Sequence, residues 1–360
     1  MKNTFGNALT LTLFGESHGS MIGAVLDGIA PGITLDDAYI QNKLTQRRPF
    51  GKISTARRED DNYNIISGVF NGKTTGAPLT VLIPNEKARS GDYERGLPRP
   101  SHADYTAYQK YHGFEDYRGG GHFSGRLTAP LVAIGAILQK ALEDKGIVIG
   151  THIKRLAGID DGTFTASKDE IALLNQKPFA VLDETAEKAM TEAIERAAKE
   201  GDSVGGVLET AIIGLPAGLG EPWFDSVESL LSHALFSIGG VKGVSFGEGF
   251  AIADLMGSEA NDPLSFENGK VVTKTNRAGG INGGITNGMP ILFSTAVRPT
   301  PSIFKEQKTV SLETSENTVL SLKGRHDPCI VHRVRAVVDA LSAFVVADLL
   351  VQRFGTDYLS

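Results

Sequence analysis

VHRVRAVVDALSAFVVADLLV, residues 331–351, is too apolar for a helix that lies on a protein surface. A second stretch of the same kind, RLTAPLVAIGAILQKAL, covers residues 126–142. A helix that is apolar on most sides is normally buried. We therefore expect both segments to lie inside the molecule, covered on both sides by sheets.

Strand-like stretches surround these two segments. Polar helical patterns fall between the strands, at 34–48, after a possible cap at Ser101, and at 184–199. Paired antiparallel strands that enclose central helices fit this order better than a regular β-α-β alternation, so the sequence predicts an α+β fold in layers. The expected strands lie at 7–13, 22–29, 62–70, 79–83, 147–156, 204–214, 243–255 and 289–297.

Length and composition are those of a globular protein. The 360 residues suit either two domains or one large, internally repetitive domain. No apolar run is long enough to span a bilayer, and residues 1–13 contain an alternating strand rather than a secretory signal, so we expect a cytoplasmic protein without a membrane partner. The formal charge of −6 argues against a nucleic-acid binder but leaves room for a small anionic ligand.

Cys329 is the only cysteine, which excludes an internal disulfide and a thiolate-rich zinc site. We expect no metal. Asp327-Pro328-Cys329 opens the apolar segment, where a helix dipole would favour a thiolate. A packed, inert thiol is the preferred interpretation, because no dedicated base stands beside it in the sequence.

Two glycine-rich stretches partly match nucleotide-binding motifs. SGVFNGKTTG lacks one of the four residues that a phosphate loop needs between its glycines, and its Asn71-Gly72 pair indicates a hairpin instead. RGGGHFSG has Ser124 where a dinucleotide fingerprint needs its third glycine, and no buried strand precedes it. Neither stretch supports a nucleoside triphosphate or Rossmann enzyme.

Three segments combine glycine with His, Arg, Ser or Asp at expected strand ends or helix starts. They are GESHGSMIGAVLDG (15–28), RGGGHFSGRLTAP (118–130) and GRHDPCIVHRV (324–334). The first could be no more than a tight turn. Together with QRRPFG, RPSHADYTAYQKYHGFEDYRGGGH, EGDSVGG, GLPAGLGEP, SIGGVKGVSFGEGF and NRAGGINGGITNG, however, the three segments resemble the chorismate synthase family across nearly the whole chain.

The resemblance implies a flavin-dependent lyase. Its substrate, 5-enolpyruvylshikimate 3-phosphate, would lose phosphate and a C6 hydrogen by an overall anti-1,4-elimination that gives chorismate, the last step of the shikimate pathway. Reduced FMN would be required without net redox change, with NADPH at most a source of reducing equivalents. The implied architecture is a single domain over residues 1–360, a layered β-α-β sandwich with internal pseudo-twofold symmetry, assembled as a homotetramer.

The resemblance also assigns the catalytic residues. His18 would protonate the departing phosphate, and His102 would protonate the reduced flavin. Imidazole suits both roles because its unperturbed pKa lies near neutrality. Asp327 and Ser17 would help flavin N5 to accept the substrate hydrogen.

Arginine is suited to an anionic substrate because it is permanently charged and forms paired hydrogen bonds to phosphate or carboxylate. The substrate-binding residues implied are Arg47, Arg48, Arg57, Arg126 and Arg325. The implied FMN contacts are His122, Phe123, Ser124, Gly239, Gly240, Gly283, Arg298, Pro299, Thr300, Pro301, Ser302 and Arg325.

Two other functions stay open at this point. A flavin oxidoreductase would oxidise one FMN for each product, whereas the lyase would turn over many substrates for each reduced flavin. An anion-binding or RNA-binding protein is disfavoured by the acidic charge. Since no added domain for flavin reduction is visible, we expect dependence on a separate flavin reductase.

Overall fold

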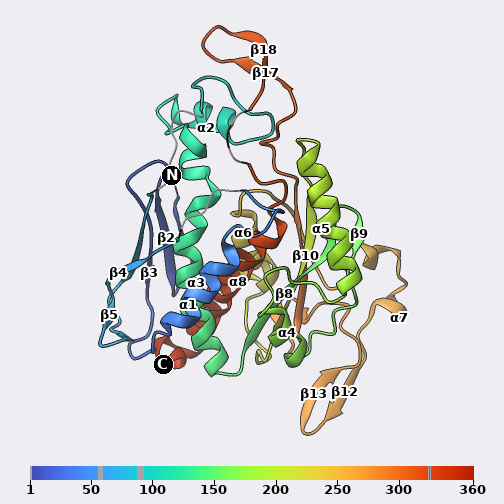
Figure 1. The fold of residues 1–360 in the computed structure, drawn as a ribbon. Coiled ribbons are helices and arrows are strands. Elements are labelled where there is room, and N and C mark those ends of the chain that lie inside the picture. The colour runs from blue at the N-terminus through green and yellow to red at the C-terminus, as the bar shows by residue number, and fades with distance from the viewer. Residues whose placement is uncertain (1, 56–59, 87–92, 323, 325) are drawn as a thin grey trace.

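The computed structural model describes residues 2–55, 60–86, 93–322, 324 and 326–360. Two five-stranded antiparallel sheets enclose a layer of helices (Figure 1). The first sheet has the order β1 (Thr4–Phe5), β2 (Thr10–Gly15), β3 (Met21–Asp27), β7 (Leu79–Pro84), β4 (Asn64–Ser67). The second has the order β11 (Val241–Phe246), β16 (Ile291–Val297), β10 (Gly206–Ile213), β8 (Val148–Leu156), β9 (Ile159–Asp160).

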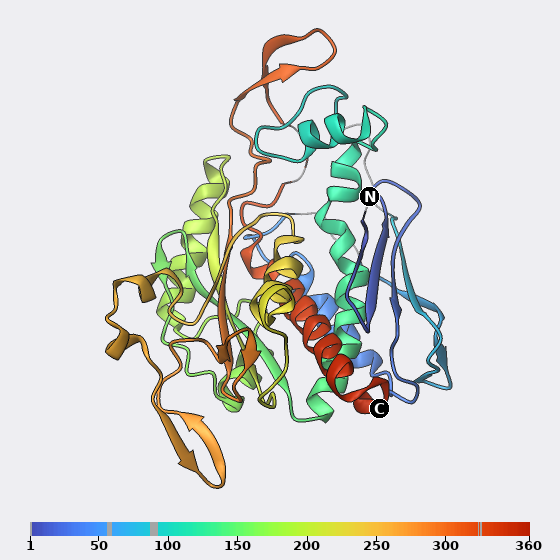
Figure 2. The ribbon, with the colours of Figure 1, turned by 180° about the vertical axis from the view of Figure 1, so that it is seen from behind.

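The central layer contains α1, α3, α6 and α8. Helix α3 packs on the first sheet, α8 packs on the second, and the two helices pack on each other. Seen from behind, α8 runs between the two sheets (Figure 2). The bounds are α1 Asp37–Arg47, α3 Thr128–Asp144, α6 Val227–Phe236 and α8 Val331–Phe354.

Shorter elements lie outside this sandwich. Helices α4 (Lys168–Leu174) and α5 (Glu184–Lys199) pack against the second sheet, while α2 (Asp104–Tyr111) and α7 (Gly257–Ala260) lie in long connections. The hairpins are β5 (Val69–Phe70) with β6 (Lys73–Thr74), β12 (Leu264–Glu267) with β13 (Lys270–Thr273), β14 (Ile281–Asn282) with β15 (Ile285–Thr286), and β17 (Gln307–Ser311) with β18 (Glu316–Leu320).

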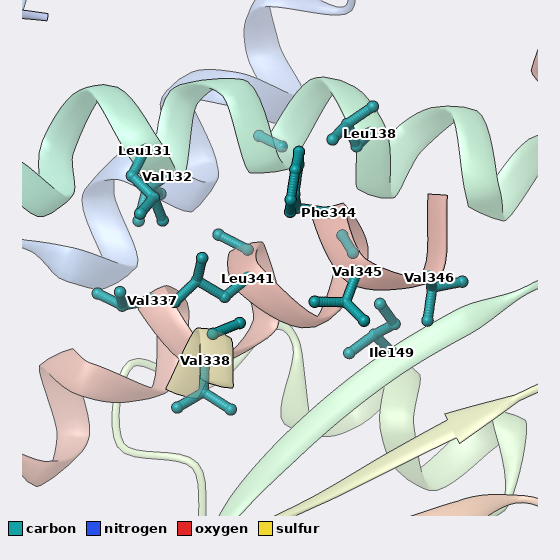
Figure 3. Packing of buried hydrophobic residues seen from close by; sticks show 14 of the residues in the cluster. Leu131, Val132, Leu138, Ile149, Val337, Val338, Leu341, Phe344, Val345 and Val346 are labelled. Atoms are coloured by element: carbon teal, nitrogen blue, oxygen red, sulfur yellow. The ribbon is translucent and has the colours of Figure 1, made fainter. Parts of the chain in front are cut away.

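The contact between α3 and α8 forms the centre of the core (Figure 3). Twenty of the 24 residues of α8 are buried. Gly135 of α3 lets the helices approach closely, because a Cβ there would lie 2.3 Å from Cβ of Ala340. The expected central helices are therefore confirmed. The first sheet and α3 come from residues 4–144, and the second sheet and α8 come from residues 148–354.

Three charged residues in the interior of α8 are buried with hydrogen-bond partners. Asp339 accepts a hydrogen bond from Oγ1 of Thr151 at 2.5 Å. Arg335 donates to the carbonyl oxygens of Leu174 and Lys177, at 2.9 and 3.0 Å. Asp348 accepts from the backbone N–H groups of residues 7, 8 and 9 and so fastens the segment before β2 to the helix. These contacts reduce the cost of burying polar groups in an apolar helix.

The predicted α+β class and the layer order are confirmed, but some boundaries were wrong. The expected strand 243–255 ends at Phe246, because Gly247 and Gly249 adopt φ of +54° and +59°, and Gly249–Asp254 forms a 3₁₀-helix. Ser101 does not cap α2, which begins at Asp104 after Ala103. Helix α1 is capped by Asp36, whose carboxylate accepts from the N–H of Tyr39.

Cys329 is fully buried, and burial raises the pKa of its thiol to about 12. This agrees with the inert thiol that the sequence favoured. No helix in the described part of the chain is long and apolar enough to cross a membrane.

Candidate active site

A cavity of about 670 Å³ opens at one end of the helix layer. Its walls come from the loop before α2, the start of α3, the turn between α6 and β11, the segment after β16, and the start of α8. The cavity brings together most of the predicted flavin contacts with residues from the predicted catalytic and substrate sets. The predicted residues in its wall are Arg47, His102, Phe123, Gly239, Gly240, Arg298, Pro299, Thr300, Pro301, Ser302 and Asp327.

A second cavity of about 360 Å³ adjoins the first across Phe123 and Gly239. His122 and Ser124 lie in its wall. Nδ1 of His122 donates to the carbonyl oxygen of Gly15 at 2.8 Å, which ties the glycine-rich segment to the end of β2.

Three consecutive glycines separate the two predicted catalytic histidines. Gly119, Gly120 and Gly121 have φ of +59°, +81° and +53°, a region that side chains rarely adopt. A Cβ on Gly119 would lie 2.2 Å from Cε1 of His18, and a Cβ on Gly120 would lie 3.2 Å from Cε1 of His102. The turn therefore needs glycine both for its backbone and for the close approach of the two imidazoles.

Ser17 is fully buried beside His18 and under this turn. Its Oγ lies 3.1 Å from Nδ1 of His18 and donates to the carbonyl oxygens of Arg118 and Gly119, at 3.3 and 3.2 Å. Its backbone N–H donates to the carbonyl oxygen of Gly121 at 3.1 Å. Ser17 thus fixes His18 to the glycine turn.

His102 lies beside an aspartate and an arginine. Its Nδ1 is 2.6 Å from Oδ1 of Asp104. Arg99 donates to both oxygens of the same carboxylate, through Nε at 2.8 Å and Nη2 at 2.9 Å. Burial opposes the charge of Asp104, but the hydrogen bonds from Arg99 and His102 outweigh it and hold the pKa of Asp104 well below its usual range.

Three of the arginines predicted to bind substrate surround Asp61. Arg47 lies 3.1 Å from its Oδ2, Nε of Arg48 lies 3.8 Å from the same oxygen, and Nη1 of Arg126 donates to Oδ1. Burial opposes the charge of Asp61, but Arg47 and Arg126 hold the pKa of this carboxylate below its usual range. Burial also lowers the pKa of Arg47 to about 10, so Arg47 stays charged at neutral pH. The cluster keeps a surplus of two positive charges.

Asp327 lies in the cavity wall at the start of α8. Its carboxylate accepts from the N–H of Thr55 at 2.9 Å and from Arg333 at 2.5 Å. Arg333 also donates to the carbonyl oxygen of Arg47 at 2.9 Å, and Thr300 donates to the carbonyl oxygen of Asp327 at 2.6 Å. These bonds join the arginine cluster, the start of α8 and the segment after β16.

Some predicted residues are not brought to the cavity. Gly283 lies in the turn between β14 and β15, outside the lining. Ser17 lies under the glycine turn, whereas its predicted partner Asp327 lines the cavity. Arg57 and Arg325 lie outside the described residues.

Sequence reasoning assigned no role to Asp61, Arg99, Asp104 or Arg333. Arg99 and Asp104 carry the clearest signal, because they stand three residues before and two residues after His102 in the quoted segment RPSHAD. Asp61 could not be found in this way, since its arginine partners are 13, 14 and 65 residues away along the chain and meet it only in the fold.

Comparison with known proteins identifies the family of this site. A sequence model of the family described as chorismate synthase matches residues 9–351. The chain belongs to the chorismate synthase family. A chorismate synthase of Thermococcus gammatolerans is 47% identical over 350 residues, and that of Pyrococcus abyssi is 48% identical over 350 residues; each alignment covers 97% of both chains. A crystal structure of a chorismate synthase superimposes with a TM-score of 0.78 at 27% identity, covering 98% of this chain and 95% of the other.

The family confirms the predicted activity. Its members are lyases that form chorismate from 5-enolpyruvylshikimate 3-phosphate, in the final step of the shikimate pathway, and they use a reduced flavin without net redox change. The competing predictions of a flavin oxidoreductase and of an RNA-binding protein are thereby set aside.

Proposed function

We propose that the 670 Å³ cavity holds reduced FMN and the phosphate ester together, and that the described residues of its wall and of the glycine turn carry out the elimination. The observation that carries the proposal is the meeting of His102, Asp327, Gly239 and the segment 298–302 in one wall. These residues are far apart in the sequence, and each was predicted independently of the cavity.

The cavity wall fits a flat, anionic cofactor. A Cβ on Gly239 would meet no atom nearer than the carbonyl oxygen of Phe123, at 4.0 Å, so the glycine leaves open space that a side chain would fill. Phe123 is 43% exposed and offers an apolar face to a ring system. Arg298 and Lys242, also in the wall, supply positive charge for a phosphate group.

The reaction breaks the bond between C3 and the phosphate oxygen and the bond between C6 and hydrogen. The existing ring double bond shifts, and the ring gains one double bond in total. When bound, the reduced flavin would supply an electron-rich ring that helps the phosphate to leave and accepts the C6 hydrogen. The proton finally released from C6 balances the one that the phosphate takes up, so nothing is consumed. The protein has to bind the anions, orient the ester over the ring and deliver protons at two places.

His18 and His102 are placed to deliver those protons. His18 would protonate the leaving phosphate oxygen. His102 would give a proton to the flavin and take it back within the same turnover. Neighbouring glycines of the turn contact the two imidazoles, so two separate proton donors are held by one turn. Fixed donors of this kind are typically worth about 10² to 10⁴ in rate.

The arginine cluster would bind the phosphate and carboxylate groups of the ester. Arg47 and Arg126 are buried and Arg47 lines the cavity, so an anion there is attracted more strongly than in water. Asp61 holds the guanidinium groups in place before the substrate arrives, which reduces the ordering needed on binding. Asp327, in the cavity wall, would assist transfer of the hydrogen from C6, and Ser17 would support the reaction by holding His18.

Assembly and cellular context belong to the same proposal. One buried cluster contains residues of both sheets, from Leu9 to Leu359, which supports a single domain over residues 1–360. Large side chains such as Phe114, Phe224 and Phe250 are at least 90% exposed, which supports burial in a homotetramer. We further propose a cytoplasmic enzyme that receives reduced FMN from a separate reductase, with NADPH as the original electron source.

An anaerobic assay tests this function. The phosphate ester is supplied with a small, known amount of chemically reduced FMN, with and without NADPH. The proposal expects many chorismate molecules for each reduced FMN, and none with oxidised FMN and NADPH alone. One product for each flavin oxidised would contradict elimination, and turnover with NADPH and oxidised FMN would overturn dependence on a separate reductase.

A further inference from the structure

The hydrogen bonds around His102 determine which of its ring nitrogens is protonated. An ionised carboxylate only accepts hydrogen bonds, so the 2.6 Å contact with Asp104 requires a proton on Nδ1 of His102. Asp104 is ionised, because its hydrogen bonds with Arg99 and His102 outweigh its burial. Among the described residues, Nε2 of His102 has no hydrogen-bond partner. This nitrogen is therefore left for whatever occupies the cavity.

Without Asp104, Arg99 would favour the other tautomer of His102, with the proton on Nε2. Its Nη2 lies only 3.1 Å from Nδ1 of His102, and a guanidinium group can only donate. Without the carboxylate, the ring would turn a lone pair toward Arg99 and carry its proton on Nε2. With the carboxylate present, Arg99 donates to Asp104 through Nε, Nη2 and its backbone N–H, at 2.8, 2.9 and 3.0 Å.

Arg99 and Asp104 are also connected to the predicted flavin contacts. Nη1 of Arg99 donates to Oγ of Ser302 at 3.1 Å, and both side chains are buried, at 8% exposure each. Arg99 thus joins the aspartate that contacts His102 to the segment 298–302 that lines the same cavity. Arg298, at the other end of this segment, donates to the carbonyl oxygen of Ser101 at 2.7 Å.

We propose that Asp104 and Arg99 are positioning residues that hold His102 with Nδ1 protonated and Nε2 presented to the cavity. The inference rests on the proposed function of the cavity, and it adds which nitrogen of His102 exchanges the proton and which side chains fix it. Neither positioning residue touches the reacting atoms. Both act through the imidazole.

Asp104→Asn tests the inference because it keeps the size of the side chain and removes its charge. Asp161→Asn is the matched control. Asp161 contacts a histidine in the same way, with its Oδ2 2.7 Å from Nδ1 of His152, but lies outside the cavity. A general loss of stability would therefore affect both variants.

The first readout needs neither flavin nor substrate. Nitrogen NMR of ¹⁵N-histidine protein, well above the ordinary histidine pKa of about 6.5, reports the protonated ring nitrogen, and a His102→Gln variant assigns the signal. We expect Nδ1–H in the wild type and Nε2–H in Asp104→Asn, with the His102 signal of Asp161→Asn unchanged. Nε2–H in the wild type, or an unchanged His102 signal in Asp104→Asn, would overturn the inference.

The second readout is single-turnover elimination with saturating reduced FMN and ester. Asp104→Asn should lower the rate by about 10- to 10³-fold, a part of what a positioned acid is worth, while the dissociation constant of FMN changes by less than about 3-fold. Asp161→Asn should keep the wild-type rate. A changed tautomer with an unchanged rate would overturn the positioning role and leave the proposed function standing. A wild type that neither binds reduced FMN nor forms chorismate would instead overturn the proposed function.

Discussion

His102 and His152 lie in two different regions of the molecule. Both contact an aspartate through Nδ1, but the surroundings of their Nε2 atoms differ. Each places Nδ1 against an aspartate, Asp104 at 2.6 Å and Asp161 at 2.7 Å. His152 lies on β8, and its Nε2 is also in hydrogen-bond contact with the carboxylate of Glu209, at 3.1 Å. The side chain of His152 is 1% exposed. In the cavity wall, His102 keeps one nitrogen without a protein partner among the described residues and is 19% exposed.

This difference separates a structural histidine from one that is available for chemistry. Burial opposes the charge of His152, but the carboxylates of Asp161 and Glu209 outweigh burial and raise its pKa. A ring held between two carboxylates stabilises the fold as a cation and has no nitrogen left for a ligand. A ring held by one carboxylate has a fixed orientation and one nitrogen to offer.

The largest expected effect is on the histidine on the other side of the glycine turn. His18→Ala should lower single-turnover elimination by about 10² to 10⁴, because it removes a positioned acid, while the affinity for reduced FMN changes little. His152→Gln is the comparison variant and should turn over at nearly the wild-type rate. If His18→Ala reacts normally, the segment GESHG is only a structural turn.

Gly119→Ala tests whether the turn itself positions His18. The new Cβ would lie 2.2 Å from Cε1 of His18 and would displace the imidazole. We expect a loss in single-turnover rate of about 10- to 10²-fold, less than removal of the acid itself.

Gly158→Ala provides the matched control. Gly158 also has a positive φ, +83°, but a Cβ there meets no atom within 4 Å. Both substitutions place a side chain at a positive φ, at a backbone cost of about 1 to 2 kcal/mol each. Only Gly119→Ala also brings a Cβ against His18 and Ser17. Equal rates for the two variants would show that the turn does not position His18.

Arg126→Ala extends the comparison from histidines to arginines. Loss of one charge-assisted contact should raise the dissociation constant of the phosphate ester by about 10- to 10²-fold, the equivalent of about 1.5 to 3 kcal/mol. Arg155→Ala is the control, because Arg155 is 55% exposed and its Nε lies 3.5 Å from Asp160 at the surface. Isothermal titration should detect weaker binding in the first variant alone, and equal affinities would remove Arg126 from the substrate site.

The smallest effect on activity is expected at His152, where the effect appears in stability. Its raised pKa means that its stabilisation is complete below the unfolded pKa of about 6.5 and is lost as the pH rises through the folded-state pKa. Denaturant unfolding should therefore give the wild type an advantage over His152→Gln of about 1 to 3 kcal/mol at pH 6 that declines toward pH 9. An advantage that grows with pH would contradict the charged state of His152.

The sequence predicted the helices and strands that depend on a local pattern of apolar residues. The apolar segments 126–142 and 331–351 gave the two central helices because they had no polar face to turn to solvent. The strand periodicity located every strand of the two sheets except the short edge strands β1 and β9. The resemblance to a known family supplied the site residues, and eleven of them line one cavity.

Most features that the sequence did not predict depend on contacts between residues that are far apart along the chain. Nothing next to Asp61 indicates that Arg126, 65 residues away, donates to its carboxylate. The hairpins 264–273, 281–286 and 307–320 were missed because strands of two to five residues are too short for a clear hydrophobic alternation. The different fates of His102 and His152 follow from which side chains the fold brings to each ring.

The most direct test of the account is whether filling the cavity abolishes flavin binding. Gly239→Val places a side chain where the nearest atom is 4.0 Å away, and φ at this position is not in the left-handed region, so the fold should tolerate it. Anaerobic titration with reduced FMN, in the presence of the phosphate ester, compares this variant with the wild type. The account predicts that Gly239→Val binds FMN at least about 10²-fold more weakly, because the valine occupies the cofactor's space. Wild-type affinity in a correctly folded Gly239→Val protein would show that the flavin binds elsewhere.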